Sequence, residues 1–239
     1  MNIVISQPMF FPWVGMFEQI RLADIYVNYD DVQFSKGSFT NRVQIKTSSG
    51  KKWLTVPLKE QKLGQCINEV KVDMSKNWQS KHVAHLTQAY QAAPFCEDML
   101  ALVEAVYQGS YSTIGQLAYA SMMKSCQYLG LDAGRRFVPV GDLGVHGTSS
   151  LRVRDIVLAL EGSRYVTGWG ARNYLNHDIF EEANIKVEYM NYKKIPYPQL
   201  HGDFNPYVSL LDLIANTGPK CIDYISSQSV YWKEFLSNV

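Results

Sequence analysis

The sequence contains few cysteines, and none of them belongs to a recognisable pair. Cys66, Cys96, Cys126 and Cys221 lie too far apart for a CxxC motif. A chain of 239 residues is also long enough to bury a core without disulfide bonds. We therefore expect reduced, mostly buried thiols, with no catalytic cysteine signature and no resident metal site.

The chain also lacks an excess of charge and a long apolar segment. It carries 23 basic and 22 acidic residues, a formal net charge of +1, whereas a dedicated nucleic-acid binder usually has a strong basic excess. No apolar run approaches the roughly 20 residues needed to cross a bilayer. The first residues do not have the pattern of a signal peptide. We expect a cytoplasmic protein with no nucleic-acid partner and no transmembrane segment.

Apolar and aromatic residues, by contrast, are plentiful. The apolar fraction is 46%, the aromatic fraction is 13%, and there are 15 tyrosines. This composition is typical of a packed globular protein and excludes extensive disorder. Because tyrosine combines a flat apolar face with a hydroxyl, the surplus suits polar ligand pockets as well as half-buried surfaces.

Strand and helix patterns alternate along the chain. Residues 3–6 and 25–29 read as buried strands, and residues 13–23 between them show helical spacing, with Pro12 suited to the first helical position. Strand, helix and strand within roughly 30 residues predict a βαβ unit with a parallel pair. The second half resumes the alternation, with strands expected at 137–140, 165–167 and 185–189, and helices at 150–160, 179–183 and 207–215.

The middle of the chain has a different pattern. Segments 43–47 and 53–56 flank a turn at residues 48–50 and predict a β-hairpin, and a short strand is expected at 67–72. Helices are expected at 77–90, 97–107 and 111–129. We therefore predict one α/β domain over residues 1–239. It has a mainly parallel, Rossmann-like sheet, a β-hairpin and a mostly helical middle segment at about 75–130.

The loop after the first strand is the first candidate ligand site. In an open parallel sheet, ligands bind beyond the carboxyl ends of the strands, and this loop also leads into a helix N-terminus that attracts anions. Gln7 offers an amide, Pro8 helps to fix the shape of the loop, Phe11 and Trp13 offer walls, and Gly15 allows close approach to the backbone. The alternative is that the aromatic residues simply pack in the core.

Asp30 and Asp31 close the second predicted strand at the same edge. Adjacent side chains of a strand point to opposite faces, so only one of the two is expected to bind a ribose hydroxyl, a metal or an amine. The alternative is a turn-capping role. The polar residues that follow are candidate ligand contacts, with the cations suited to phosphate; alternatively they are solvated hairpin residues. They are Gln33, Asn41, Arg42 and Lys46.

His82 and His85 lie three residues apart and share a helix face. The neighbouring sequence supplies no third ligand for zinc. We consider His82 a candidate general base, and the alternative is a surface histidine without a chemical role.

Two further strand-end loops carry glycine, hydroxyl and aromatic residues. Ser149 belongs to a run of good helix-capping residues, and Arg152 and Arg154 follow in a first turn, where the helix dipole disfavours positive charge. A bound anion would relieve that conflict. Gly168 and Gly170 follow the strand at 165–167, with Tyr174 just beyond, and all three are candidates for ligand contact. If the strands run parallel, all three loops share one rim.

Several motifs together resemble the WbqC-like protein family. They are Gln7-Pro8, Pro12-Trp13 and Gly15, then DDVQF, NR, IKT and WLTVP, Trp78 with His82, the glycine-rich segment around 165–174, and YPQLHGDFNPYVSLLDLIANTG. The resemblance covers nearly the whole chain. The family most often has histidine before Gln-Pro, whereas this chain has Ser6.

The resemblance implies a role in bacterial surface-polysaccharide biosynthesis, notably of O-antigen lipopolysaccharide. It implies a transferase that forms an amide by moving a glycine-type aminoacyl or acyl group onto an amino sugar. The partners would be a nucleotide-linked or lipid-linked amino sugar and a small acyl or amino-acid donor, with ATP and Mg²⁺ needed if a free amino acid is activated. His82, Asp30 and Asp31 are then the candidate catalytic residues.

Two alternatives stay open on the sequence. One is a non-catalytic nucleotide-sugar binding protein of the same pathway. The other is a nucleotidyl-transfer enzyme in which Asp30 and Asp31 hold Mg²⁺. The chain has no GxxxxGK[ST] motif, so it is not a P-loop protein. Whether it forms a homo-oligomer is also open.

Overall fold

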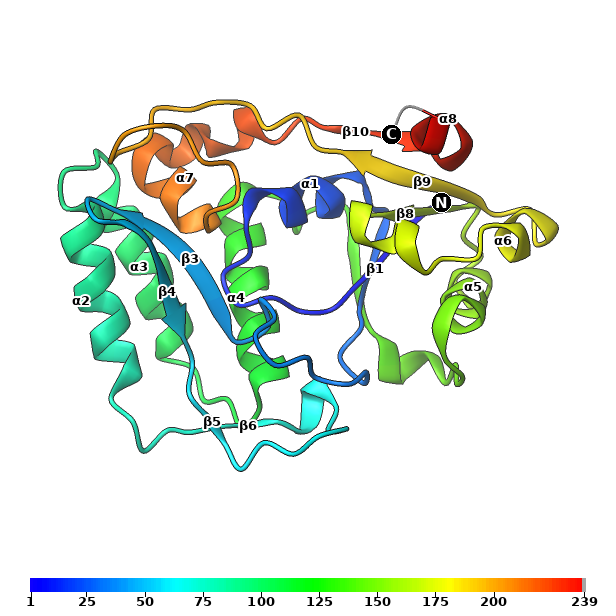
Figure 1. The fold of residues 1–239 in the computed structure, drawn as a ribbon, viewed down its shortest axis with the longest axis horizontal. Coiled ribbons are helices and arrows are strands. Elements are labelled where there is room, and N and C mark those ends of the chain that lie inside the picture. Colours follow the sequence, from blue (N-terminus) through cyan, green and yellow to red (C-terminus); the bar gives the residue numbers. More distant parts are fainter. Residues whose placement is uncertain (238–239) are drawn as a thin grey trace.

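A six-stranded sheet forms the centre of the molecule (Figure 1). The computed structural model describes residues 1–237. The strands lie in the order β10-β9-β8-β1-β2-β7, and all neighbours pair in parallel except β9 and β10. Their bounds are β1 Asn2–Ser6, β2 Ile25–Asn28, β7 Arg136–Pro139, β8 Arg164–Thr167, β9 Lys186–Asn191 and β10 Gln228–Tyr231. The predicted α/β class with a mainly parallel sheet is confirmed.

The predicted βαβ unit is present at the start of the chain. Strands β1 and β2 pair in parallel with Ile3 opposite Ile25, and helix α1 (Val14–Leu22) connects them. Trp13 is the N-cap of α1 and keeps an extended backbone, so Pro12 lies before the cap rather than at the first helical position. The prediction for Pro12 was therefore wrong by two positions.

The two faces of the sheet carry separate apolar cores. Along β1, Ile3 and Ile5 belong to one cluster and Val4 to the other, because successive side chains of a strand point to opposite faces. The cluster of Ile3 is completed by residues from α5 (Ser149–Ala159), α6 (Asp178–Glu182) and α8 (Trp232–Ser237). The cluster of Val4 continues through α1 into the helical part of the chain.

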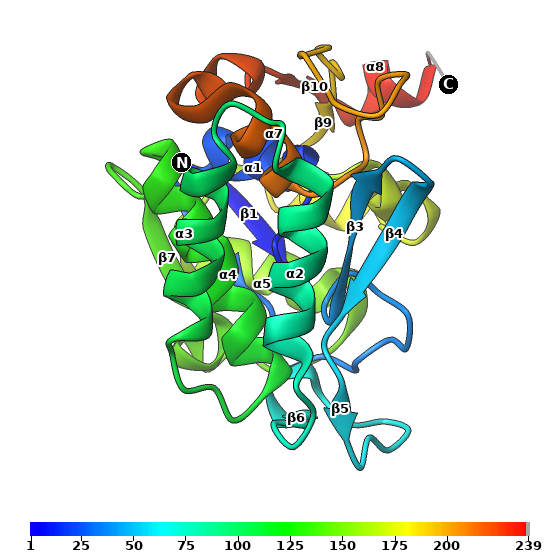
Figure 2. The same cartoon turned by 90° about the vertical axis from the view of Figure 1, so that its left-hand side faces the viewer.

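That helical part packs beside the sheet as a group of four helices (Figure 2). It consists of α2 (Trp78–Tyr90), α3 (Cys96–Tyr107), α4 (Ile114–Leu129) and α7 (Leu210–Thr217). Next to it stands the predicted hairpin, made of β3 (Arg42–Thr47) and β4 (Gly50–Thr55). Helices α4 and α7 each begin three residues later than predicted. The reason is that Thr113 Oγ1 and Ser209 Oγ cap them by accepting from Gln116 N and Leu211 N.

Two other segments differ from the prediction. The expected strand at 67–72 is a single 3₁₀ turn, Ile67–Glu69, followed by the short strand β6 (Lys71–Val72), which pairs with β5 (Leu58–Lys59). The edge strand β10 and the helix α8 were not predicted at all. Within residues 1–237, no helix is both long enough and apolar enough to cross a membrane.

The strand order contains one topological switch point. From β1 the chain proceeds to β2 and then to β7 on one side, whereas β8 and β9 lie on the other side of β1. The carboxyl ends of β1 and β8 therefore meet where the direction of winding reverses. Open α/β sheets bind their ligands at such a crevice.

Candidate functional site

A cavity of about 760 Å³ lies at this switch point. Its lining comes from the carboxyl ends of β1, β2, β8 and β9 and from the loops that follow them. Aromatic residues dominate the lining and are joined by amides and hydroxyls: Trp13, Tyr29, Tyr165, Trp169, Tyr174, Tyr192 and Tyr207, with Gln7, Gln19, Ser6, Ser149 and Thr167. The volume is within the usual range of small-molecule sites.

The structure brings three predicted loops together around this cavity. Gln7 and Trp13 come from the loop after β1, Ser149 from the start of α5, and Gly168, Gly170 and Tyr174 from the loop after β8. All six residues line the cavity. Their role as ligand contacts stays a prediction, because the structure fixes where they lie and not what they bind.

Trp13 forms the wall of the cavity on the side of α1. Its ring lies 5.1 Å from the ring of Tyr192 and 5.9 Å from that of Tyr207, measured between centroids. Gly15 lies beneath the indole, and a Cβ added to it would stand 2.1 Å from Trp13 Cη2. The close approach that the sequence suggested at Gly15 is therefore made by Trp13 itself and not directly by a ligand.

Gly168, in the loop after β8, also allows a close approach, here by a side chain of α1. A Cβ at this position would lie 2.6 Å from Gln19 Nε2, so the missing side chain lets the Gln19 amide approach the loop. Sequence reasoning missed Gln19 because it lies in the middle of α1, away from the strand ends.

The segment that follows β9 also contributes residues that were not singled out. Tyr192, Lys194 and Tyr207 line the cavity. Lys194 has a left-handed backbone with φ of 53°, which costs energy for a residue other than glycine. Its Nζ lies 5.4 Å from the centroid of the Tyr207 ring. Among the cavity-lining residues within 1–237, Lys194 is the only cation, and none is a carboxylate, an imidazole or a thiol.

Asp31 is held at the rim of the cavity by Arg152 of α5. Arg152 donates from both terminal nitrogens to the carboxylate, at 2.9 Å to Oδ1 and 2.5 Å to Oδ2. The conflict between Arg152 and the helix dipole is therefore relieved by a carboxylate of the same chain, where the sequence suggested a bound anion. Arg154 pairs with its neighbour Asp155.

Asp30 has a separate environment, as expected for adjacent positions. Its carboxylate accepts a hydrogen bond from Asn28 Nδ2 at 3.1 Å. Burial raises the pKa of Asp30, and the negative charge of Asp31 adds to the increase. Neither Asp30 nor Asp31 is among the residues that line the cavity.

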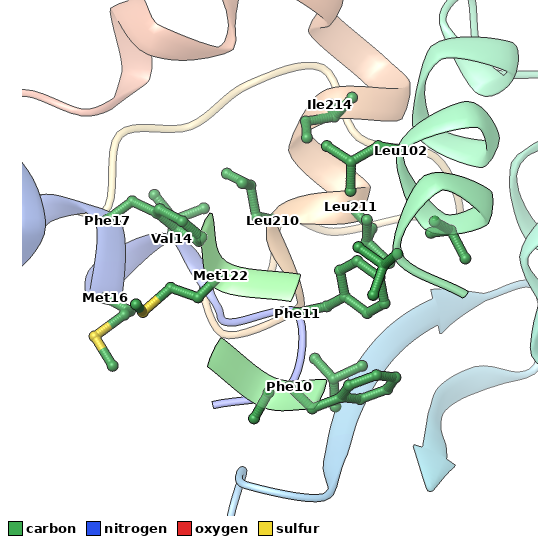
Figure 3. Close-up of a cluster of buried hydrophobic side chains, with 14 of the residues drawn as sticks. Phe10, Phe11, Val14, Met16, Phe17, Leu102, Met122, Leu210, Leu211 and Ile214 are labelled. Carbon is green, nitrogen blue, oxygen red and sulfur yellow. The ribbon is translucent and has the colours of Figure 1, made fainter. Parts of the chain in front are cut away.

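The other aromatic residues of the first loop belong to the core (Figure 3). Phe10 and Phe11 are buried in the same apolar cluster as Leu210 and Leu211 of α7, with Phe11 close to Leu211. Phe11 has a left-handed backbone with φ of 40°, held by Ser121 Oγ, which accepts from its N–H at 2.9 Å, and by Ser209 Oγ, which donates to its carbonyl. Pro8 is also buried. Phe11 was predicted to form a wall of the ligand site, but it packs in the core.

The polar residues around the hairpin stabilise the fold locally. Asn41 donates to the Val56 carbonyl at 3.0 Å, and Arg42 stacks over Trp53 at 4.1 Å and donates to the Gly37 carbonyl. Gln33 is exposed, and its backbone forms an isolated antiparallel β-bridge with Cys66. Lys46 is buried and donates to acceptors of the segment 199–203. The structure does not bring these four predicted contacts (Gln33, Asn41, Arg42, Lys46) into the cavity lining formed by residues 1–237.

His82 lies in the helical part, away from the cavity. It is buried, its Nε2 donates to the Thr55 carbonyl at 3.2 Å, and its Nδ1 accepts from the Tyr107 hydroxyl at 2.9 Å. Burial lowers the pKa of His82 to about 4. Both ring nitrogens are thus bound by the protein, which favours a structural role over that of a general base. Residues 1–237 contain no group of three acidic, histidine or cysteine side chains that could hold a metal ion.

The fold and the cavity together define an α/β protein with a candidate ligand cleft at the switch point of its sheet. The model of the WbqC-like protein family matches residues 7–224, so the chain belongs to this family. It is also 30% identical over 227 residues to Uncharacterized protein Rv1507c of Mycobacterium tuberculosis (strain ATCC 25618 / H37Rv), across 94% of this chain and 97% of that protein. No solved structure matches the chain significantly.

Proposed function

We propose that the chain binds a nucleotide-linked amino sugar in the switch-point cleft and transfers an acyl or aminoacyl group to the sugar amine. The setting would be the biosynthesis of a surface polysaccharide such as O-antigen. The observation that supports the proposal is the lining, which combines aromatic faces with amides, hydroxyls and a single lysine. Flat bases and sugar rings stack on aromatic faces, and a few polar groups fix their orientation.

The charged part of such a ligand has two favourable places in the cleft. Lys194 would pair with the diphosphate, since it is the only cation among the lining residues of 1–237. Ser149 is the first residue of α5 and also lines the cavity, so the positive end of that helix faces the ligand. Trp13 and Tyr207, next to Lys194, offer their rings to the base.

The transfer itself would join the amine nitrogen to the carbonyl carbon of an activated acyl donor. The leaving group departs with the electron pair of its bond, and the amine loses a proton. Because the lining residues of 1–237 include no carboxylate or imidazole, this proton would pass to water or to the leaving group. The protein would then contribute mainly by orienting the two reactants.

The same observation favours a second candidate, a non-catalytic nucleotide-sugar binding protein. Such a protein needs the aromatic walls and the lysine but no acid or base. The nucleotidyl-transfer alternative has less support, because Asp31 is engaged by Arg152 and the described residues offer no cluster of metal ligands. For the same reason residues 1–237 offer no ligand set for Mg²⁺, and we derive no step through that ion.

The test uses purified protein with UDP-, dTDP- and GDP-linked amino sugars and either a preactivated donor (an acyl thioester or an aminoacyl adenylate) or glycine with ATP and Mg²⁺. Mass spectrometry would detect a new amide, together with AMP or ADP, and calorimetry would measure binding. Lys194→Met should abolish binding and product, whereas Lys193→Met, at an exposed neighbour outside the lining, should retain both. Binding without product from any acyl donor would favour the second candidate. Neither binding nor product would reject both.

A further inference from the structure

Tyr29 is a half-buried residue at the carboxyl end of β2, and its side chain lines the cleft. Its backbone N–H donates to the Ser6 carbonyl at 3.0 Å, which ties it to the end of β1. The guanidinium carbon of Arg152 lies 5.0 Å from the centroid of its ring. Tyr29 therefore stands between the cleft and the ion pair formed by Arg152 and Asp31.

The guanidinium of Arg152 has little freedom to move. Two of its nitrogens donate to Asp31, at 2.9 Å and 2.5 Å, and its Nε donates to the Val145 carbonyl at 3.1 Å. Arg152 is itself buried. A two-point pairing of this kind fixes the plane of the guanidinium as well as its position, so its place over the Tyr29 ring is also fixed.

This arrangement decides what the Tyr29 hydroxyl can do. Arginine has only donors, so the Tyr29 phenol cannot give its hydrogen to the neighbouring Arg152 guanidinium. The phenol hydrogen is then free to point to another acceptor. Burial raises the pKa of Tyr29, the positive charge of Arg152 acts in the opposite direction, and Asp31 adds to the increase. Tyr165 and Tyr174 line the same cleft.

We infer that Tyr29 is the hydrogen-bond donor that recognises an acceptor oxygen on the sugar or acyl portion of the ligand, with Arg152 and Asp31 as positioning residues. The inference rests on the proposed function. Lys194 follows β9, which is three strands away from β2 in the sheet, a separation of roughly 14 Å at about 4.8 Å per strand. A ligand whose diphosphate lies at Lys194 would bring its far portion to Tyr29.

The first experiment tests the coupling between Arg152 and Tyr29 without any ligand. 3,5-Difluorotyrosine is placed at position 29, and its ionisation is followed by fluorine NMR as a function of pH. Arg152→Met should raise the pKa of this phenol, because it removes the positive charge that lies 5.0 Å from the ring centroid. Arg154→Met is the matched control, since Arg154 lies on the same helix and pairs with Asp155. Equal pKa values in the two variants would overturn the inference.

The second experiment tests recognition of the ligand by calorimetry with the same panel of nucleotide-linked amino sugars and with free UDP, dTDP and GDP. Tyr29→Phe should weaken binding of the sugar-linked form about tenfold and leave binding of the free diphosphate unchanged. Tyr231→Phe, which removes a hydroxyl that donates to Glu181, should change neither. Asp31→Asn should act like Tyr29→Phe in this assay.

Unchanged binding of the sugar-linked form by Tyr29→Phe would overturn the inference, as would an equal loss for both forms. If the wild-type protein binds no member of the panel, the proposed function is rejected. The fluorine titration would then still test, without any ligand, whether Arg152 positions Tyr29.

Discussion

Lys46 Nζ donates a hydrogen bond to Gln199 Oε1 at 2.9 Å and joins the hairpin to the irregular segment after β9, which contributes Lys194 and Tyr207 to the cleft lining. The same ammonium donates to the carbonyls of Gly202 and Asp203. All three of its donors are therefore used, and the side chain is buried. A cation in this position organises an irregular segment that otherwise has few regular backbone hydrogen bonds.

Lys46→Met should destabilise the protein by about 2–3 kcal/mol, because three acceptors lose a charged donor. It should also weaken ligand binding, since the segment that Lys46 holds in place continues to Tyr207, which lines the cleft. Denaturant unfolding measures the first effect and calorimetry the second. Lys51→Met is the matched control, because Lys51 lies opposite Lys46 in the hairpin register and is exposed. Similar losses in both variants would contradict this role for Lys46.

His82 should make the stability of the protein depend on pH. Its folded-state pKa of about 4 lies below the ordinary value of 6.5, so the folded state favours the neutral imidazole. This stabilisation is fully present above about pH 6.5 and is lost as the pH falls toward 4. A shift of about 2.5 pKa units corresponds to roughly 3 kcal/mol.

The measurement compares free energies of unfolding at about pH 7 and pH 5 for wild type and His82→Gln. The variant should be less stable at neutral pH and should lose less stability on acidification. His146→Gln, at an exposed histidine, should follow the wild type. If His82→Gln abolished product formation while its stability and ligand binding were retained, the structural role would be wrong, and His82 would be restored as a candidate base.

The rule that ligands bind beyond the carboxyl ends of parallel strands predicted where the cleft lies, but not all the residues that line it. Gln7, Ser149 and Gly168 directly follow strands or begin a helix, so parallel topology brings them together. Phe11 packs in the core, whereas Trp13, two residues later, lines the cleft. This difference depends on the left-handed backbone of Phe11, which sequence patterns do not reveal.

The features that the sequence did not predict share one reason: they depend on tertiary contacts that local patterns do not show. Lys194 and Tyr207 lie on a long irregular segment, where neither helical nor strand periodicity indicates which side chains face inward. Asp31 and Arg152 are 121 residues apart, and each had a plausible partner of another kind, an amine or metal for the carboxylate and a bound anion for the arginine. Only the folded structure shows that they satisfy each other.

Gln7→Ala should weaken ligand binding without a loss of stability. Within residues 1–237 no hydrogen bond is made by the Gln7 side-chain amide, although it lines the cavity. Its removal should cost about 1 kcal/mol of binding free energy, the usual value of one hydrogen bond. Calorimetry with the nucleotide-linked amino sugar that binds wild type measures this, and thermal unfolding checks stability. Gln33→Ala, at an exposed position, should bind normally; an equal loss there would contradict the prediction.

Gly15→Ala should disturb the cleft through Trp13. The added methyl group would lie 2.1 Å from Trp13 Cη2, so the indole must move away from Tyr192 and Tyr207. Overpacking of this kind usually costs about 1–3 kcal/mol, and the displaced ring would weaken binding of an aromatic base. Tryptophan fluorescence, unfolding and calorimetry measure the three effects. Gly141→Ala is the matched control, because Gly141 lies outside the cavity lining and, within residues 1–237, no neighbouring heavy atom lies within 4 Å of its added methyl group. If Gly15→Ala left fluorescence and stability as in Gly141→Ala, the packing of Trp13 over Gly15 would not be what shapes this wall of the cleft.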